Sequence, residues 1–294
     1  MAVLICGSLA FDTIMHFEGR FREHILPEQL HILNVSFLVP QLQRDFGGCA
    51  GNVAYGLKLL GGQALPMATL GSDGEAYLNR LKQLGIATDF VKMVHDHYTA
   101  QAMIMTDVDN NQITAFHPGA MMQAHTNRVE KRPDITLGIV SPDGREAMIE
   151  HAQQFADAGI PFVFDPGQGL PMFDGEALRH FIELATWVAV NDYEGKMLTD
   201  RTGWGSAEIS SRVKGLMVTL GADGCEVWQD QQMEKVAPVK ARAVVDPTGC
   251  GDAWRSALLF GLEQGWDLLR CAELGNKMGA LKIASRGPQN YTLE

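Results

Sequence analysis

The feature that most constrains the fold of this chain is a regular alternation of short apolar runs with amphipathic segments. The apolar runs have the length of buried strands and include VLIC at 3–6, LGIV at 137–140, WVAVN at 187–191 and LMVTLG at 216–221. Segments with helical spacing alternate with them, among them 50–60, a stretch after Pro142 and 177–184. Strands that alternate with helices predict right-handed βαβ units, and therefore an α/β fold with a mostly parallel central sheet.

Two segments, at about 13–45 and 86–118, break this rhythm. The first contains a predicted strand over 31–39. The second contains FVKMV, AQAMIMTDV and ITAFHP, the last two joined by a DNNQ turn. Together they are expected to form a small antiparallel sheet. Because both segments leave and rejoin the main succession, we interpret the chain as a single domain over 1–294 with an inserted lid above the sheet edge.

The composition excludes several classes of function. With 24 Lys and Arg against 35 Asp and Glu, the net charge of -11 argues against a broad surface for nucleic acid or for an anionic membrane. The five cysteines are scattered and never spaced as Cys-x-x-Cys, so neither a disulfide framework nor a thiolate metal site is predicted. No apolar run approaches the ~20 residues of a membrane span. We expect a soluble protein of the reducing cytoplasm.

A glycine-rich turn, DPTGCGDAW at 246–254, precedes an apolar pattern with helical spacing. Gly249 and Gly251 leave the backbone around Cys250 free of bulky side chains, at a helix start where N–H groups are unpaired and the dipole is positive. Such a turn can bind an anion, and Asp252 would stand beside it as a base for an attacking hydroxyl. The alternative is a tight turn whose aspartate only complements the helix dipole.

Two further motifs follow predicted strands. Asn191 and Glu194 lie three residues apart at a helix start, where they could hold a hydrated Mg²⁺ or form a helix capping box. Thr219 and Gly221 end the strand at 216–221, where they could grip a nucleotide or make a simple turn. Ligands of open parallel sheets bind at the carboxyl ends of strands, which is where each of these motifs is expected.

In the order NDYE, VTLGADG, DPTGCGD, these motifs closely resemble the PfkB/ribokinase family of ATP-dependent sugar and nucleoside kinases. The resemblance implies a ribokinase-like three-layer α/β/α sandwich with a small β-sheet lid, and phosphate transfer from ATP to an alcohol group. It implies that Asp252 is the general base and that Gly249, Cys250 and Gly251 form an anion hole. It further implies ATP and Mg²⁺ as cofactors, with Asn191 and Glu194 holding the magnesium through water. By the same resemblance, Thr219 and Gly221 contact the nucleotide phosphates, and Asn276 lines the adenine pocket.

The N-terminal half resembles the acceptor-binding motifs of the same family, in GSLAFD at 7–12 and FGGCAGN at 46–52. Asp12 would accept hydrogen bonds from vicinal hydroxyls, and Asn52 would bond another hydroxyl. Gly47 and Gly48 would let a polyol approach the backbone. The alternative for these residues is a turn aspartate and a helix entry.

Two residues depart from the family pattern. Cys250 stands where alanine is usual, which leaves a backbone N–H contact intact. Cys49 stands where ribokinases commonly carry lysine, which argues against ribose itself as the acceptor. The resemblance also raises a monovalent cation such as K⁺ near Asp246 and Thr248, as in parts of the family, and the sequence leaves this cation undecided.

The lid segments favour a nucleoside as the acceptor. They are rich in apolar and aromatic side chains, including Met15, Phe17, Met103, Met105 and Phe116. A purine base is bound by flat apolar walls, whereas a sugar needs mainly polar partners. We therefore predict phosphorylation of the primary hydroxyl of an adenosine-like ribonucleoside, with Gln101 and Phe116 as contacts. The alternative for the same stripe is a packing face or a homodimer contact through the lid.

Two other functions remain open from the sequence. One is a sugar kinase acting on ribose, fructose or a sugar phosphate. A sugar phosphate would need the basic residues of the lid segments to converge, namely Arg20, Arg22, Arg44 and Lys92. The other is a non-catalytic ligand sensor, against which the joint presence of Asp252 and the glycine turn argues. A hydride-transfer enzyme fits worst, because no strand-GxGxxG-helix unit exists.

Overall fold

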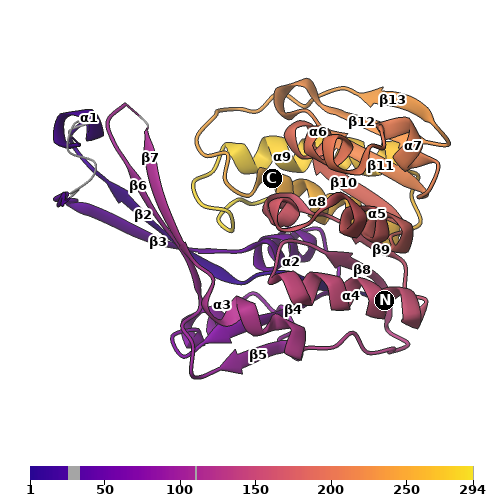
Figure 1. The fold of residues 1–294 in the computed structure, drawn as a ribbon, viewed down its shortest axis with the longest axis horizontal. Helices are drawn as coiled ribbons and strands as arrows, with labels where there is room; N and C mark the ends of the chain where they lie inside the picture. Colours follow the sequence, from indigo (N-terminus) through magenta and orange to yellow (C-terminus); the bar gives the residue numbers. More distant parts are fainter. Residues whose placement is uncertain (26–33, 110, 294) are drawn as a thin grey trace.

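The computed structural model describes residues 1–25, 34–109 and 111–293. Within them, a nine-stranded sheet with the order β13-β12-β11-β10-β9-β8-β1-β4-β5 runs through the middle of the molecule (Figure 1). Neighbouring strands are parallel from β11 to β5, and β12 and β13 add an antiparallel edge. The strands are β1 Ala2–Cys6, β4 Ala64–Gly71, β5 Val91–Val94, β8 Ile135–Val140, β9 Phe162–Phe164, β10 Trp187–Asn191, β11 Gly215–Thr219, β12 Cys225–Gln229 and β13 Gln232–Val236.

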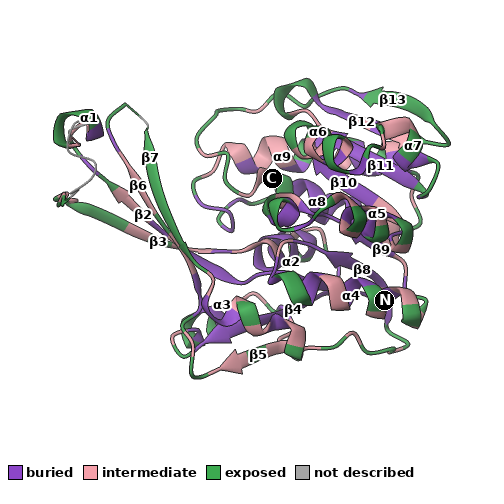
Figure 2. Cartoon of the chain, in the orientation of Figure 1, coloured by how far each residue is buried: buried purple, intermediate pink, exposed green. Residues whose placement is uncertain are grey.

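Helices cover both faces of this sheet, which confirms the expected three-layer α/β/α architecture. One layer holds α2 Cys49–Leu59, α3 Glu75–Gln83, α8 Cys250–Glu263 and α9 Leu268–Ile283. The other holds α4 Arg145–Ala158, α5 Gly175–Leu184, α6 Asp192–Thr202 and α7 Ser206–Ser210. In β1, Val3 and Ile5 pack toward the first layer, while Leu4 and Cys6 pack toward the second. Burial on both faces, purple in Figure 2, explains why the central strands are unbroken apolar runs.

A second sheet, which we call the lid, projects from one side of the sandwich (Figure 1). Its strands, in the order β3-β2-β6-β7, are β2 Ala10–His16, β3 Gln41–Gly47, β6 Ala100–Thr106 and β7 Gln112–His117, and the short helix α1 Phe21–His24 follows β2. The 3-10 turns η2 Gly119–Thr126, η3 Gly167–Met172 and η4 Gly221–Asp223 follow β7, β9 and β11. The sheet has an inner face, which includes Asp12, Ile14, Ala102, Ile104 and Phe116, and an outer face, which includes Thr13, Leu42, Gln101, Met103 and Ile113.

Three details of the predicted lid are corrected. The sheet is mixed rather than antiparallel, because β2 and β6 pair in parallel after the chain has passed through α2, β4, α3 and β5. The FVKMV segment forms β5, which pairs with β4 in the large sheet. Of the strand predicted over 31–39, residues 31–33 lie outside the described residues and 34–39 form no strand. The lid strand is β3 instead, a largely solvated edge strand without the apolar alternation that sequence patterns detect.

The order of the large sheet reverses at β1, with β4 on one side and β8 on the other. The connections that leave β1 and β8 therefore diverge, and ligands of open α/β sheets bind at such a reversal of the strand order. The motifs predicted from the sequence follow β1, β10 and β11 or begin α2 and α8. The topology thus brings segments from both ends of the chain to one edge of the sheet.

Candidate active site

The glycine turn lies at the start of α8. Gly249 is the residue that caps this helix, and its φ of 79° is a left-handed conformation that favours glycine. A Cβ at this position would also come within 2.7 Å of the Pro288 side chain. Because the first N–H groups of a helix have no intrahelical acceptor, the turn offers the N–H groups of Gly249 and Gly251 to an anion, whereas the Cys250 N–H donates to the Pro247 carbonyl at 3.2 Å.

Asp252 and Asn52 meet although 200 positions separate them in the chain. Asn52 Nδ2 donates a 2.8 Å hydrogen bond to Asp252 Oδ2, because α2 and α8 pack side by side. Burial raises the pKa of Asp252 to about 6, and the hydrogen bond from Asn52 opposes that rise. A carboxylate from the glycine turn and an amide from the acceptor motif therefore share one site.

Sequence analysis did not identify the side chains that orient Asn52. Gln289 Nε2 donates to Asn52 Oδ1 at 3.0 Å and lies 2.7 Å from the Tyr77 hydroxyl. Tyr77 in turn donates to the Gly47 carbonyl at 2.7 Å. Tyr77 comes from α3 and Gln289 from the segment after α9, and neither belongs to a recognisable motif. Only the packed structure brings them beside the site.

Asp12 lies on the inner face of the lid, directly beside Gly47. A Cβ on Gly47 would come within 2.3 Å of Asp12 Oδ2, so a side chain there would displace the carboxylate. Gly48 caps α2 with a φ of 85°, another position that favours glycine. Burial, together with the carboxylates of Asp45 and Asp252, raises the pKa of Asp12 to about 6. The mutual influence of Asp12 and Asp252 places both acids in the same region.

Arg255 is a second residue that sequence analysis missed. Its Nη2 lies 3.0 Å from Asp165 Oδ1 and 3.7 Å from Glu194 Oε2, and all three side chains are largely buried. Asp165 follows β9 and Glu194 follows β10, so Arg255 ties α8 to two strand ends. The signal that could have found it is its spacing, because Arg255 lies one helical turn after Asp252.

The capping alternative for Asn191 and Glu194 is present at the start of α6. Asn191 Oδ1 accepts from the Glu194 N–H at 2.7 Å, and Glu194 Oε2 accepts from the Asn191 N–H at 2.8 Å. Thr219 lies opposite Asn191 in the register of β10 and β11, and Gly221 begins η4 just beyond. These motif residues therefore lie together at two strand ends. In the part of the chain that the structure describes, no group of three or more His, Cys, Asp or Glu side chains could hold a metal.

Asn276, in α9, is engaged in protein contacts. Its Oδ1 accepts from Trp254 Nε1 at 3.0 Å, and its Nδ2 donates to the Ala237 carbonyl at 2.9 Å. It therefore joins α8 to the segment that follows β13. The two cysteines of the site are protonated thiols, because burial raises the pKa of Cys250 to about 11 and that of Cys49 well above its ordinary value.

The two lid residues predicted to contact the acceptor lie on opposite faces. Phe116 is on the inner face with Asp12, to which it is linked through the pairing of Ala102, and 53% of Phe116 is exposed. Gln101 is on the outer face, where its Nε2 donates to Thr13 Oγ1 at 2.6 Å. Only Phe116 therefore faces the Asp12 side of the lid.

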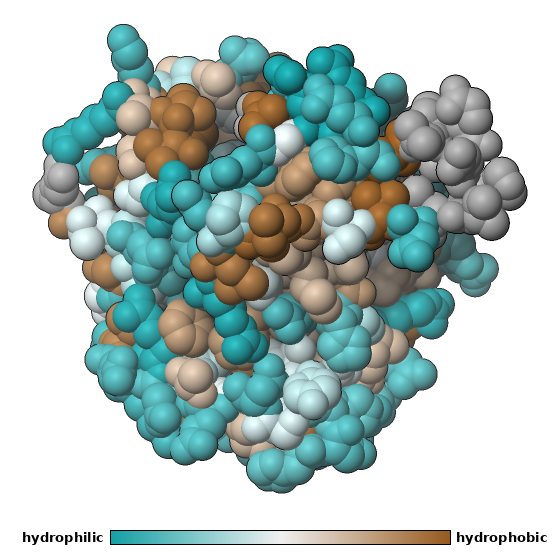
Figure 3. Space-filling model, turned by 90° about the vertical axis from the view of Figure 1, so that its left-hand side faces the viewer, coloured by the Kyte–Doolittle hydropathy of each residue, from teal (hydrophilic) through white to brown (hydrophobic). Residues whose placement is uncertain are grey.

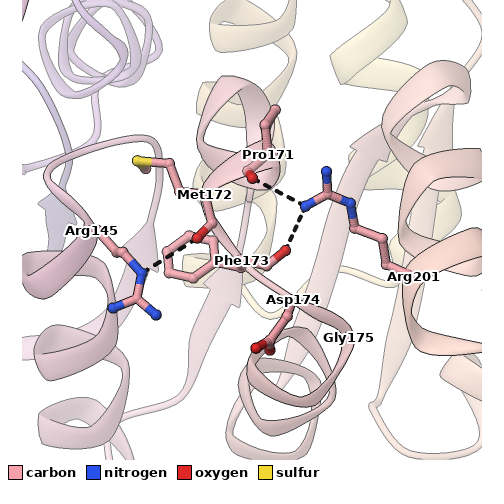
Figure 4. A pocket seen from close by; sticks show the side chains of 7 residues that line it. All are labelled: Arg145, Pro171, Met172, Phe173, Asp174, Gly175 and Arg201. Atoms are coloured by element: carbon pink, nitrogen blue, oxygen red, sulfur yellow. Dashed lines mark hydrogen bonds between the residues drawn. The ribbon is translucent and has the colours of Figure 1, made fainter.

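A separate pocket lies between η3 and the helices of the second layer (Figure 4). Arg201 donates to the carbonyls of Leu170 and Pro171, and Arg145 donates to the Met172 carbonyl at 3.3 Å. Both guanidinium groups therefore brace the η3 turn, and none of the site residues above lines this pocket. Among the helices in the described residues, none is both long enough and apolar enough to cross a bilayer.

The chain matches the family model of pfkB carbohydrate kinases over residues 18–294. It is 30% identical to a nucleoside kinase of Methanocaldococcus jannaschii over 96% of this chain and 90% of that protein. It is 26% identical to the ribokinase of Mus musculus, over 83% of this chain and 80% of that one. The structure of a Burkholderia thailandensis nucleoside kinase in complex with inosine superposes with a TM-score of 0.89 at 55% identity, covering 99% of this chain and 93% of the other. The chain therefore belongs to the pfkB family and is an ATP-dependent kinase of the nucleoside and sugar kinase group.

Proposed function

We propose that this kinase transfers the γ-phosphoryl group of ATP to the primary hydroxyl of a ribonucleoside, with an adenosine-like purine nucleoside as the acceptor. The observation that carries the proposal is the hydrogen bond between Asn52 and Asp252, because it joins the acceptor-binding helix to the phosphate-binding helix. Phosphoryl transfer to an alcohol needs a base within reach of both substrates. The inosine complex of the Burkholderia thailandensis relative supports a purine nucleoside.

Asp252 acts as the general base in this proposal. With a pKa of about 6, its carboxyl is ionised at neutral pH and still basic enough to take the proton of the attacking hydroxyl. As the new oxygen–phosphorus bond forms, the bond from the γ-phosphorus to the bridging oxygen breaks, and ADP leaves. The N–H groups of Gly249 and Gly251 stabilise the charge on the equatorial phosphoryl oxygens, and the Cys250 N–H joins them by exchanging the Pro247 carbonyl for a phosphoryl oxygen.

The nucleotide lies along the strand ends, with its phosphates at Thr219 and Gly221. Because both ends of its amide are engaged in protein contacts, Asn276 does not bond the adenine itself. It holds in place the segment after β13, and that segment borders the adenine. When bound, Mg²⁺ neutralises charge on the phosphates. Asn191 and Glu194 would offer the oxygen ligands that Mg²⁺ prefers, and because each already commits an oxygen to the capping box, they would hold the ion through water.

The acceptor lies between α2 and the inner face of the lid. Asp12 accepts hydrogen bonds from the ribose hydroxyls, with Gly47 and Gly48 leaving room for close approach. The purine base of the nucleoside packs on the apolar part of the inner face, which is formed by Ile14, Ala102, Ile104 and Phe116. Gln101 supports the lid through Thr13 instead of bonding the base.

Residues 1–294 act as one kinase domain whose lid closes over the acceptor and excludes water.

The outer face of the lid exposes three apolar side chains, Leu42, Met103 and Ile113, whose exposed fractions are 64%, 37% and 42%. Figure 3 views this side of the molecule and shows apolar groups set among polar ones. A second copy of the chain is the partner we propose for this face, and sedimentation analysis measures whether the dimer forms.

The basic residues of the lid segments argue against a sugar-phosphate acceptor. They do not converge on one place: Arg20 and Arg22 share Asp109, whereas Arg44 pairs with Asp73 and Lys92 donates to Thr126. Lys92 lies in β5 of the large sheet and Arg44 in β3 of the lid, so no cluster for an acceptor phosphate forms among them. A free sugar remains the second candidate acceptor, supported by the similarity to ribokinase.

The test is release of ADP from Mg·ATP by purified protein with adenosine, inosine, guanosine, cytidine, ribose, fructose or fructose 6-phosphate. We expect turnover on purine nucleosides and a loss of at least about a hundredfold in Asp252→Asn. Turnover on sugars alone would contradict the proposal that the acceptor is a nucleoside. Full activity of Asp252→Asn would contradict the proposal that Asp252 is the general base. A protein that binds these compounds without turning any of them over would be a ligand sensor.

A further inference from the structure

Lys282 is a fully buried lysine behind the glycine turn. It lies in the last turn of α9, and its side chain is 0% exposed. Its Nζ donates to the main-chain carbonyls of Asp246 at 2.8 Å and Ser285 at 3.1 Å. The same atom lies 3.5 Å from Asp246 Oδ2. A buried ammonium group is costly unless each donor finds a partner, and here three oxygens surround it.

These contacts hold two loops together. Asp246 begins the loop that leads into the glycine turn, and its carboxylate also accepts from the N–H groups of Thr248 at 2.9 Å and Gly287 at 2.8 Å. The second loop follows α9 and carries Pro288, which Gly249 closely approaches. The next residue of that loop, Gln289, bonds Asn52. One cluster around Lys282 therefore ties the loop that leads into the glycine turn to the loop that follows α9.

The oxygens around Nζ are the kind that a potassium ion takes as ligands, namely main-chain carbonyls and a carboxylate. A monovalent cation is the group that the family resemblance raises beside Asp246 and Thr248. The ammonium of Lys282 already occupies these oxygens. A potassium ion therefore does not fit at this position while Lys282 is in place.

We propose that Lys282 is a tethered monovalent cation, a positioning residue that holds the glycine turn in place of K⁺ and makes this kinase independent of monovalent cations. The inference rests on the proposed function, because it assigns the glycine turn as the anion hole. Donors that are fixed before the reaction stabilise the charge of the transition state more than that of the bound nucleoside. Loss of the ammonium should therefore lower kcat and leave the KM for the nucleoside nearly unchanged.

The experiment compares Lys282→Ala with the wild type in choline chloride and in potassium chloride at equal ionic strength. We expect the wild type to turn over equally in both salts. Lys282→Ala empties the space around the Asp246 and Ser285 oxygens, so its kcat should fall at least about tenfold in choline and recover in K⁺ or NH₄⁺. Lys277→Met is the matched control, since it removes an exposed lysine from the same helix and should respond to neither salt.

A second readout does not depend on turnover. Thermal unfolding of Lys282→Ala should occur at a higher temperature in potassium chloride than in choline chloride, because K⁺ binds the emptied site, while the wild type should show no difference. This shift can be seen even if no acceptor is phosphorylated, which separates failure of this inference from failure of the proposed function. Specific activation or stabilisation of the wild type by K⁺ would overturn the proposal, whether or not the variant folds. A folded Lys282→Ala that ignores K⁺ in both measurements would overturn it as well.

Discussion

Two carboxyl groups of this site, those of Asp12 and Asp252, are made unusually basic by their surroundings. Burial raises the pKa of both Asp12 and Asp252 to about 6, and nearby carboxylates add to the rise at Asp12. The Asn52 amide acts in the opposite direction on Asp252, because its hydrogen bond favours the ionised form. The pKa of the proposed base Asp252 is therefore a balance between its buried position and the hydrogen bond from one amide.

We predict that kcat/KM falls as the pH drops below about 6, because Asp252 must be ionised to accept a proton and Asp12 to bind hydroxyls. Asn52→Leu removes the amide that favours the ionised base, so the acidic limb should move to higher pH. The check is a pH profile of kcat/KM for both proteins. Asn290→Leu serves as the control, since its amide bonds the Arg286 carbonyl instead. A limb that stays in place in Asn52→Leu would contradict the role of Asn52.

The strands of the lid have two chemically different faces, because alternate side chains point to opposite sides of the sheet. In β7, Phe116 faces inward and Ile113 faces outward, so this strand provides a matched pair of variants. Phe116→Ala should raise the KM for a purine nucleoside roughly tenfold with little change in kcat, because it removes an apolar wall from the base. Ile113→Ala should leave KM unchanged. Steady-state kinetics of the two variants test this prediction. If both variants changed the KM equally, the inner face would not be the surface that binds the purine.

In the whole molecule, the buried carboxyl of Asp252, the proposed general base, lowers the free energy of unfolding at neutral pH. An aspartate with a pKa near 6 in the folded chain and an ordinary one in the unfolded chain makes folding less favourable as the pH rises through that interval. Asp252→Asn should therefore be more stable than the wild type at pH 8 by on the order of 3 kcal/mol, with the difference vanishing below about pH 4. Urea unfolding at several pH values measures it. Asp200→Asn, which removes an exposed carboxylate from α6, is the control for the loss of one negative charge.

The alternation of strands and helices in the large sheet and the glycine positions were predictable from the sequence, because they depend on local patterns, whereas the three layers were expected from the family resemblance. Strands buried on both faces are continuous apolar runs, amphipathic helices repeat every turn, and a left-handed turn favours glycine. The same holds for motifs at strand ends, which the topology then gathers at one edge. Residues such as Asp252 and Gly249 thus carried their signal in the chain itself.

Other features were decided only by the tertiary structure. The parallel pairing of β2 with β6, the contact of Asn52 with Asp252, and the burial of Lys282 against Asp246 join positions far apart in the chain. None of these leaves a periodic trace in the sequence, because each depends on which surfaces meet after the helices have packed. A lysine near the end of a helix resembles any other lysine until the fold closes two loops around its ammonium group.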